Sequence, residues 1–238
     1  SGYVWNWQLS IAVAKAVRDR NPSCLILAGG PHVPDLQLDM FEQYPFIDIA
    51  CHGEGEVTFY EILTAYGNGK GFEQIPGLSY HNRTTGKVTR NSKRPRIKDL
   101  DCIPSPYLTG ILDEFFDGRL SPFIETNRGC PYKCSFCSIH IHAGRKYRRY
   151  SVEHVLDHIE NLTKNHGVHH IHFEDDNLTL DRKRFMELMN GIIDRKLKFT
   201  WDTPNGTFAN ALDEEMMLLI KKTGCTYLIV APESGDQW

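Results

Sequence analysis

Three of the seven cysteines of this chain lie within eight residues of sequence, as Cys130, Cys134 and Cys137. The spacing C-x3-C-x2-C on one short loop lets three thiolates converge on a single metal centre, because thiolates are preferred ligands of zinc and of iron–sulfur clusters. An odd number of cysteines, crowded in this way, favours a metal site in a reducing compartment over a disulfide framework. The first chemistry that the sequence indicates is therefore metal binding through sulfur.

Two kinds of metal site are open at this loop. A structural zinc ion takes four protein ligands, and His140 or His142 could complete a Cys3His site. A cubane [4Fe–4S] cluster usually takes four cysteines, so three would leave one iron without a protein ligand. Such an open position can bind a substrate or cofactor, as in catalytic metal sites. The spacing favours the cluster, with the Cys3His zinc site as the alternative.

The residues around these cysteines resemble the signature of radical S-adenosylmethionine (SAM) enzymes. The aromatic Phe136 precedes the last cysteine, and residues 125–129 resemble the family's approach from a strand to the cluster loop. The resemblance implies a [4Fe–4S] cluster on Cys130, Cys134 and Cys137 that chelates SAM, with Phe136 beside the adenine. It further implies reductive cleavage of SAM to a 5′-deoxyadenosyl radical, which abstracts hydrogen from a small-molecule substrate. The electron would come from a donor such as flavodoxin or ferredoxin.

Alternating strands and helices are predicted to position this loop. Short apolar runs predict strands at residues 123–126, 170–173, 199–201 and 227–230. Apolar residues recurring every three or four positions predict helices at residues 151–166, 182–197 and 212–223. The fold class is therefore α/β, and this order is half of a (β/α) barrel in count. By resemblance to a (β/α)6 barrel, residues 121–238 are expected to form a partial radical SAM domain.

Polar residues follow each of the four predicted strands. The cysteine loop follows the first strand, Asp175 and Asp176 the second, residues 204–206 the third, and Glu233 and Ser234 the fourth. Barrels of this kind place their active sites at the carboxyl ends of the strands. By resemblance, Asp175 and Asp176 lie where the family binds the SAM amino group. Glu233 and Ser234 lie near where it contacts the ribose or methionine part. A solvated turn is the simpler alternative for both segments.

A second α/β layer is predicted at the start of the chain. Strands are expected at residues 24–28 and 46–51, and helices at residues 9–18, 35–44 and 57–66. Phe59, Leu63 and Tyr66 are the expected core positions of the last helix. Residues 67–120 are predicted to be a linker that contains one β-hairpin, with strands around 78–80 and 87–89.

Glycines follow both strands of this first layer. Gly29 and Gly30 end the first strand, and Gly53 and Glu54 follow the second. Glycine lets a backbone approach a planar or phosphorylated ligand closely. Upstream of a radical SAM core, these segments resemble the second half of a Rossmann-like cobalamin-binding (B12-binding) domain over residues 1–66. The Asp-x-His-x-x-Gly motif of that module does not occur in the sequence, and the strands that carry it are expected to precede residue 1.

Three functions follow from these resemblances. The first is a cobalamin-dependent radical SAM enzyme, a subclass that methylates unactivated carbons or rearranges or cyclises rings. The second is a radical SAM enzyme that does not use cobalamin, resembling methylthiotransferases. The third is a non-catalytic metal-binding module built on the zinc site. The fold does not determine the substrate, because specificity in this architecture lies in loops and later segments.

The composition excludes several other classes. The 238 residues are 41% apolar and 24% charged, unlike a disordered tail, a collagen-like repeat or a coiled coil. A net charge of −3 gives no global basic field, so nucleic acid is not an expected partner. No apolar run approaches the roughly 20 residues of a membrane span, and a cytoplasmic location is expected. The chain is expected to be an internal fragment of a longer enzyme, with little or no turnover alone.

Histidines and the remaining cysteines receive simpler interpretations. His169, His170 and His172 lie on or beside one predicted strand and are interpreted as structural residues. Cys51 and Cys225 lie in or beside strands and are interpreted as small buried hydrophobic residues.

Overall fold

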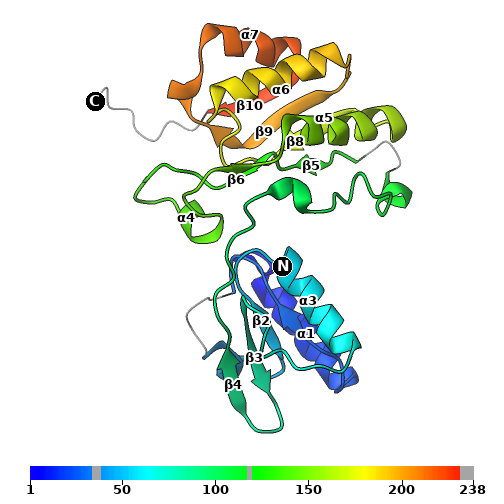
Figure 1. Ribbon diagram of the computed structural model, residues 1–238, viewed down its shortest axis with the longest axis vertical. Coiled ribbons are helices and arrows are strands. Elements are labelled where there is room, and N and C mark those ends of the chain that lie inside the picture. The colour runs from blue at the N-terminus through cyan, green and yellow to red at the C-terminus, as the bar shows by residue number, and fades with distance from the viewer. Residues whose placement is uncertain (34–38, 117–119, 231–238) are drawn as a thin grey trace. The chain divides into compact units, whose positions relative to one another are not determined.

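The computed structural model describes residues 1–33, 39–116 and 120–230 of the chain (Figure 1). It forms two compact units, Ser1–Ile97 and Lys98–Trp238, which are described here one at a time.

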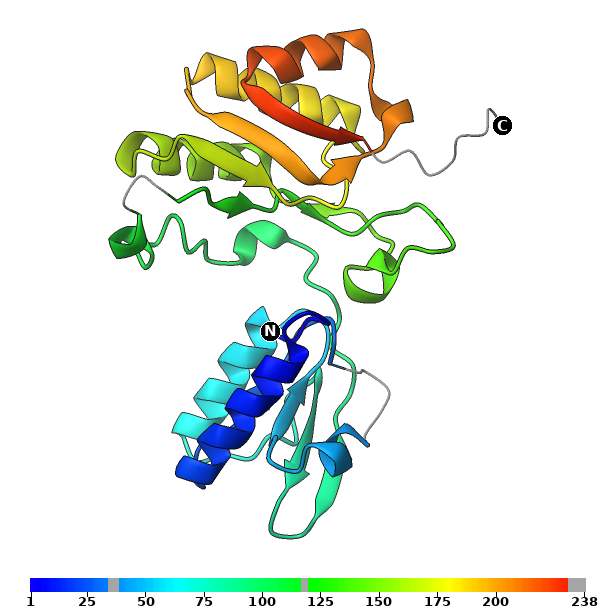
Figure 2. The ribbon, with the colours of Figure 1, turned by 180° about the vertical axis from the view of Figure 1, so that it is seen from behind.

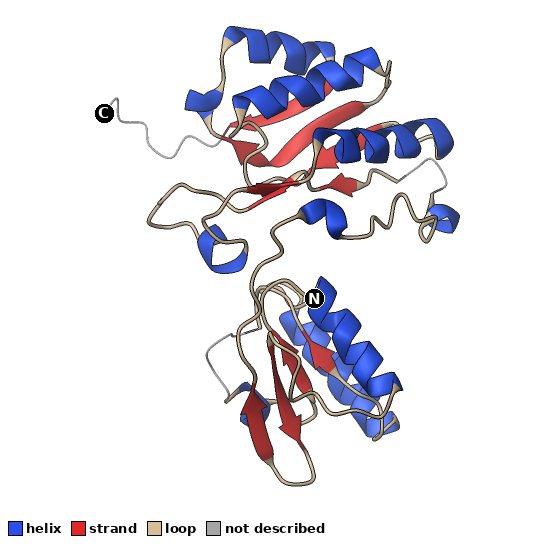
Figure 3. Ribbon diagram, in the orientation of Figure 1, coloured by secondary structure: helices blue, strands red, loops and turns tan. Residues whose placement is uncertain are grey.

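The N-terminal unit is built on a four-stranded sheet with the order β1-β2-β3-β4 (Figure 3). The strands are β1 (Leu27–Ala28), β2 (Ile49–Cys51), β3 (Leu78–Asn82) and β4 (Lys87–Arg90). β1 and β2 run parallel, whereas β3 and β4 continue the sheet in antiparallel pairing. The predicted parallel layer is therefore present, with a hairpin added at its edge.

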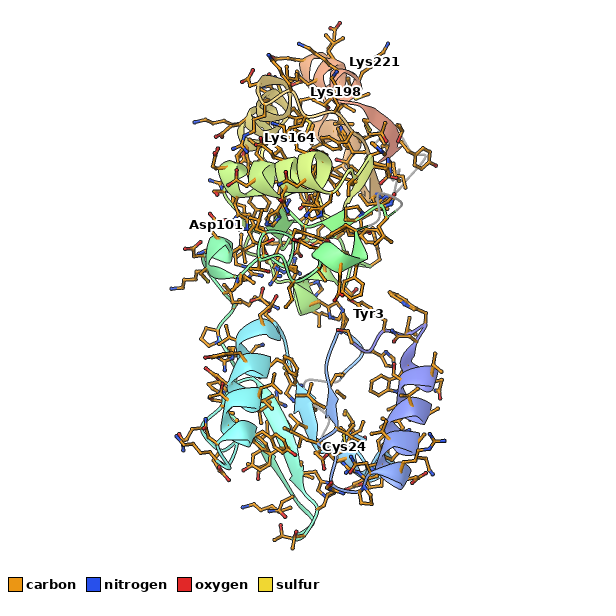
Figure 4. All side chains as sticks on the ribbon, turned by 90° about the vertical axis from the view of Figure 1, so that its right-hand side faces the viewer. Tyr3, Cys24, Asp101, Lys164, Lys198 and Lys221 are labelled. Carbon is orange, nitrogen blue, oxygen red and sulfur yellow. The ribbon has the colours of Figure 1, made fainter. Side chains whose placement is uncertain are left out.

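Helices cover both faces of this sheet, as Figure 4 shows from the side. α1 (Trp7–Arg20) packs on one face through a cluster that includes Ala50, and α3 (Glu56–Gly67) packs on the other through a cluster that includes Ile49. Neighbouring residues of β2 serve opposite faces because side chains alternate along a strand. A short helix, α2 (Met40–Gln43), lies within the predicted helix 35–44, of which residues 35–38 lie outside the described residues.

The core face of α3 differs from the prediction. Phe59, Leu63 and Tyr66 are 48%, 51% and 53% exposed, whereas Ile62 and Ala65 are buried. The prediction was wrong because α3 is apolar on two adjacent faces, and the sheet contacts the face that carries Ile62.

The predicted linker over residues 67–120 is divided between the two units. Its hairpin pairs with β2, and Arg83 in the hairpin turn lies 2.8 Å from the buried carboxylate of Asp48. These backbone and charge contacts make the hairpin part of the N-terminal unit, which extends to Ile97. Residues 98–116 belong to the second unit, where Leu100 is fully buried and the Asp101 carboxylate accepts a hydrogen bond from the Ser151 backbone. This stretch carries two 3-10 turns, η1 (Leu100–Cys102) and η2 (Asp113–Phe115).

The C-terminal unit contains a fully parallel sheet with the order β10-β9-β8-β5 (Figure 2). The strands are β5 (Phe123–Ile124), β8 (His170–Phe173), β9 (Thr200–Thr207) and β10 (Cys225–Val230). The four predicted parallel strands are confirmed, but β9 is longer than expected. Residues 204–206 lie within β9 because its pairing with β10 continues, with register shifts, to Thr207.

Three helices cover one face of this sheet (Figure 1). They are α5 (Val152–Glu160), followed by a π-helical turn η3 (Asn161–Asn165), then α6 (Arg182–Asp194) and α7 (Glu214–Lys222). Ser151 caps α5 as predicted, by accepting a hydrogen bond from the His154 backbone. Asp181 and Asp213 cap α6 and α7 in the same way.

Four further short elements complete the described part of this unit. They are the antiparallel strands β6 (Asn127–Arg128) and β7 (Arg148–Arg149), the short helix α4 (Ile139–His142) and the 3-10 turn η4 (Ala209–Ala211). Within the described residues, no helix has the length and apolar character needed to cross a membrane.

Candidate functional site

The cysteine loop is closed at its base by the pairing of β6 with β7. Gly129, which follows β6, has a φ of +88°, and the Cys130 N–H donates to the Gly144 carbonyl at 3.1 Å. A Cβ atom on Gly129 would lie 2.6 Å from the Lys146 carbonyl oxygen and 2.9 Å from that of Gly144. Both the backbone conformation and the space require glycine here, because the residue 129 backbone lies directly against the carbonyls of residues 144 and 146.

The three cysteines of the loop are free thiols. Cys134 is exposed, and Cys130 and Cys137 are half-buried. Burial raises the pKa of the Cys130 thiol, and negative charge on Asp176, Cys137 and Cys134 adds to that rise. Cys130 is therefore within electrostatic range of the other two sulfur atoms and of the Asp176 carboxylate.

The three thiols on one loop form a sulfur donor set. Around one tetrahedral zinc ion, sulfur ligands lie about 3.8 Å apart, whereas in a cubane each cysteine binds a different iron and the sulfurs stand farther apart. Among the described residues, three ligand atoms within 4.8 Å of one another are found at His170, His172 and Asp202, and the three cysteines do not form such a group. The donor set is the one expected for a [4Fe–4S] cluster, with the Cys3His zinc site as the alternative.

The predicted acidic pair after β8 consists of two residues with different surroundings. Asp175 is 2% exposed, and its Oδ1 accepts hydrogen bonds from the backbone of Thr126 at 2.8 Å and Asn127 at 2.7 Å. Burial raises the pKa of Asp175 to about 7, against the opposing effect of these hydrogen bonds. Asp176 is half-buried, accepts from the Gly129 N–H, and has a pKa that burial raises. Asp175 thus stabilises the turn between β5 and β6 through backbone hydrogen bonds, whereas Asp176 contacts Gly129 at the start of the cysteine loop.

A buried arginine completes this frame. Arg184 on α6 is 5% exposed and donates to the Thr126 hydroxyl, the Thr126 carbonyl and the Tyr150 carbonyl, each at 3.1 Å. It therefore ties together the chain just before β6 and the chain just after β7. Arg184 is not among the site residues predicted from sequence. The sequence does place a charged residue at this position on the apolar stripe of the helix, four positions before Leu188, and that is the signal from which its burial could have been predicted.

Other predicted site residues of this unit lie on the exposed side of the loop or beyond the described residues. Phe136 is 69% exposed on the cysteine loop. Glu233 and Ser234 lie outside the described residues. Asn205, which lies within β9, donates to the carbonyl and carboxylate of Glu174 at 3.1 and 2.9 Å. The ends of β8 and β9 are thus connected by side chains.

The predicted cobalamin residues of the N-terminal unit differ in accessibility. Gly53 is exposed with a φ of +77°, and no atom lies within 4 Å of the position of a Cβ. At Gly29 such an atom would meet the Cys51 Cβ at 3.6 Å, an ordinary contact. Gly30 is closed by the chain's first residues, with Gly2 N 2.7 Å from a Cβ position. The Glu54 carboxylate accepts a hydrogen bond from the Ile97 N–H at 2.8 Å. The Gly29 carbonyl accepts a hydrogen bond from the Gly2 N–H at 2.6 Å. Gly53 therefore offers the accessible backbone of this set, whereas Gly29, Gly30 and Glu54 have partners within the unit.

Residues 124–237 match the family model of the radical SAM superfamily. This part of the chain belongs to the superfamily. The family predicted from the cysteine spacing is therefore confirmed, and so is its α/β architecture with a parallel sheet.

Relatives of this radical SAM chain include named methyltransferases. It is 41% identical over 168 residues to the cobalamin-dependent radical SAM methyltransferase TokK of Streptomyces tokunonensis, an alignment that covers 67% of the chain and 24% of TokK. It is 34% identical over 229 residues to the uncharacterized methyltransferase PH0819 of Pyrococcus horikoshii, covering 94% of the chain and 48% of the relative. The chain spans less than half the length of these curated relatives.

A solved structure shares the fold of the chain. The cobalamin-dependent SAM radical enzyme OxsB, solved with aqua-cobalamin and SAM bound, aligns with a TM-score of 0.77 at 23% identity. The alignment covers 97% of the chain and 34% of OxsB. Because it spans nearly all of the radical SAM chain, it supports the order of an α/β layer followed by the parallel sheet.

Proposed function

We propose that this chain is the cofactor-binding part of a cobalamin-dependent radical SAM methyltransferase that acts on a small molecule. The observation that carries the proposal is the cysteine loop: three free thiols on one loop that follows the first strand of a parallel sheet. The named relatives support methyl transfer as the reaction. When bound, the [4Fe–4S] cluster supplies the electron for reductive SAM cleavage, and cobalamin supplies a carrier for the methyl group.

The residues of the loop would hold the cluster and orient SAM. Cys130, Cys134 and Cys137 are the proposed iron ligands. Asp176, whose carboxylate lies beside Cys130, would attract the positively charged amino group of SAM. Phe136 presents an exposed aromatic ring that suits stacking on adenine.

Asp175 would act through the backbone instead of touching SAM. Its carboxylate is buried against residues 126 and 127, where it orients the turn that leads into the loop. For Glu233 and Ser234 we retain the ribose or methionine part of SAM as the proposed contact, on the resemblance alone. An acidic flavodoxin-like or ferredoxin-like protein is the proposed source of the electron.

Cobalamin binding is proposed for the N-terminal unit, at the backbone of Gly53. Gly29 and Gly53 both follow parallel strands, and Gly53 leaves its backbone open to a ligand. Gly29, Gly30 and Glu54 are less suited to contact, since each has a partner within the unit. Because these residues already have partners within the unit, the experiments below also test the second candidate, a radical SAM enzyme that does not use cobalamin.

Anaerobic reconstitution with iron and sulfide tests the cluster. The chain and its Cys102→Ser variant should each take up about four irons and four sulfides and release a small amount of 5′-deoxyadenosine from SAM under dithionite, without multiple turnover. Cys102 is exposed and lies outside the loop, so it is a matched control for Cys134→Ser, which should do neither. A colourless protein with one zinc ion per chain would show the proposal to be wrong.

Hydroxocobalamin tests the N-terminal unit separately. The reconstituted chain is incubated with hydroxocobalamin and passed through a desalting column. Corrin absorbance that travels with the protein is expected, and it should fall in Gly53→Leu, which fills the open backbone. A corrin-free protein that still cleaves SAM would favour the second candidate.

A further inference from the structure

The face of the C-terminal sheet that is turned away from the helices carries a group of polar side chains. Ile171 and Trp201 are fully buried in the core. Side chains alternate along a strand, so His170 and His172 on β8 point to the opposite face from Ile171, and Asp202 on β9 from Trp201. His172 is paired in register with Asp202, which brings the three side chains together.

The distances within this group are short. His172 Nδ1 lies 2.7 Å from Asp202 Oδ1, and His170 Nε2 lies 3.3 Å from Asp202 Oδ2. The three candidate ligand atoms all lie within 4.8 Å of one another. The side chains are 18–25% exposed, so they are partly shielded from water but open to an ion.

A neighbouring threonine contacts the other nitrogen of His170. Thr200 Oγ1 lies 2.8 Å from His170 Nδ1 and 3.1 Å from the His169 carbonyl oxygen. When the hydroxyl donates its single hydrogen to that carbonyl, it accepts from Nδ1, and Nε2 of the neutral imidazole then directs a lone pair at the Asp202 carboxylate. In this tautomer, Nε2 and the carboxylate are two acceptors that a cation joins, either a proton or a metal ion.

The surroundings match those of a metal-binding histidine. A ligating histidine usually donates its other N–H to a fixed acceptor, as His170 does to Thr200 in this tautomer. The ring of His172 is held by stacking on Phe123, with centroids 4.8 Å apart and an interplanar angle of 28°. Two imidazole nitrogens and one carboxylate form a ligand set for zinc and related divalent transition metals, with further positions left to water.

We propose that His170, His172 and Asp202 bind a divalent transition-metal ion, with zinc as the simplest occupant, and that this ion cross-links β8 and β9. The site contains no thiolate and is separate from the cysteine loop. Its role is structural: it joins the strands whose carboxyl ends carry Asp175 and Asn205. The strand interpreted from sequence as bearing structural histidines would thus bear metal ligands.

Metal binding is tested in the full chain with Cys130, Cys134 and Cys137 all replaced by serine, which removes the competing thiolates. After dialysis against Zn²⁺, this background should retain one zinc ion per chain and show a higher Tm than the metal-free protein. With Co²⁺ it should show visible ligand-field bands without thiolate charge-transfer bands. Because the three cysteines of the loop are absent, this result is independent of the proposed function.

Three variants of this background decide the assignment. His172→Gln should weaken Zn²⁺ binding at least 100-fold, whereas His169→Gln, an exposed position beside β8, should leave it unchanged. Asp202→Asn is nearly isosteric, so it provides the test if His172→Gln does not fold. Zinc should no longer raise the Tm of this variant. A folded background that takes up no zinc, or zinc binding of equal strength in Asp202→Asn, would overturn the proposal and leave a proton between His170 and Asp202.

Discussion

The two units of the chain place different residues at the carboxyl ends of their parallel strands. In the C-terminal unit these positions carry Asp175 and Asp176, and their carboxylates bind the backbone that leads into the cysteine loop. In the N-terminal unit they carry Gly29 and Gly53, where a Cβ would meet little or nothing. One unit holds its loop through buried polar side chains, and the other offers accessible backbone.

This difference corresponds to two modes of ligand binding. A metal cluster needs ligands held at fixed positions, so a second layer of hydrogen bonds must orient the loop that carries them. A large planar cofactor can be bound through shape, for which glycine backbone gives the closest approach. The contrast predicts that similar substitutions have unequal effects in the two units.

The largest effect is expected for Gly129→Ala. The alanine Cβ would collide with the carbonyl oxygens of Lys146 and Gly144, and φ would remain in the left-handed region. Reconstituted iron content should fall more than tenfold. The matched variant in the other unit is Gly53→Ala, which meets no atom and bears only the left-handed strain of about 1–2 kcal/mol. Equal iron content in the two variants would contradict the role of Gly129.

A strong pH dependence is expected from Asp175. Its pKa is about 7 when folded, against 3.8 as the ordinary value, so the native state holds a proton that the unfolded chain releases. The contribution of Asp175 to the free energy of unfolding should therefore be most favourable below pH 4 and fall by about 4 kcal/mol as the pH rises through 7. Asp175→Asn keeps the accepting oxygen and removes the charge, so its unfolding curve should lose this slope. Urea unfolding between pH 4 and 8 measures both; an unchanged slope would refute the assignment.

His158 should produce a slope of the opposite sign. It is 7% exposed on α5, and burial, followed by the nearby His154, lowers its pKa from 6.5 to about 4. The stabilisation is therefore present above pH 6.5 and is lost as the pH falls through 4, by about 3 kcal/mol. Between about pH 4 and 6.5 this slope opposes that of Asp175, so the unfolding free energy of the unsubstituted chain should change little there. The same titration of His158→Gln should show the full fall due to Asp175. A His158→Gln curve that stays level in this range would contradict the assignment.

Arg184→Met should lower the free energy of unfolding by about 3 kcal/mol, because it removes the buried hydrogen bonds of a charged guanidinium to the Thr126 hydroxyl and to the Thr126 and Tyr150 carbonyls. Iron retention should fall with it, since these carbonyls flank the ends of the cysteine loop. Arg182→Met, on the same helix, removes only exposed ion pairs to Asp213 and Glu215 and should cost less than about 1 kcal/mol. Iron retention equal in the two variants would show that Arg184 stabilises the fold without supporting the loop.

The difference between the units also shows what the sequence could predict. Local signals were sufficient for the strand at 170–173, the cap at Ser151 and the spacing of the cysteines, because each depends on a few neighbouring residues. The bond from Arg184 to Thr126 joins positions 58 residues apart, and no periodic pattern reports it. Likewise, the pairing of β2 with the hairpin depends on contacts across the unit, so the hairpin was assigned to a linker.

The smallest effect is expected for Leu63→Ser on α3, which is the sharpest test of where the N-terminal core lies. A core position would cost several kcal/mol, but Leu63 is 51% exposed, so the change in unfolding free energy should stay within about 0.5 kcal/mol. Ile62→Ala, one position earlier, removes a side chain that is 1% exposed and should cost about 2–5 kcal/mol. Denaturant unfolding of the two variants compares adjacent residues of one helix. If Leu63→Ser were the more damaging, the face of α3 that meets the sheet would be the one that its apolar pattern first predicted.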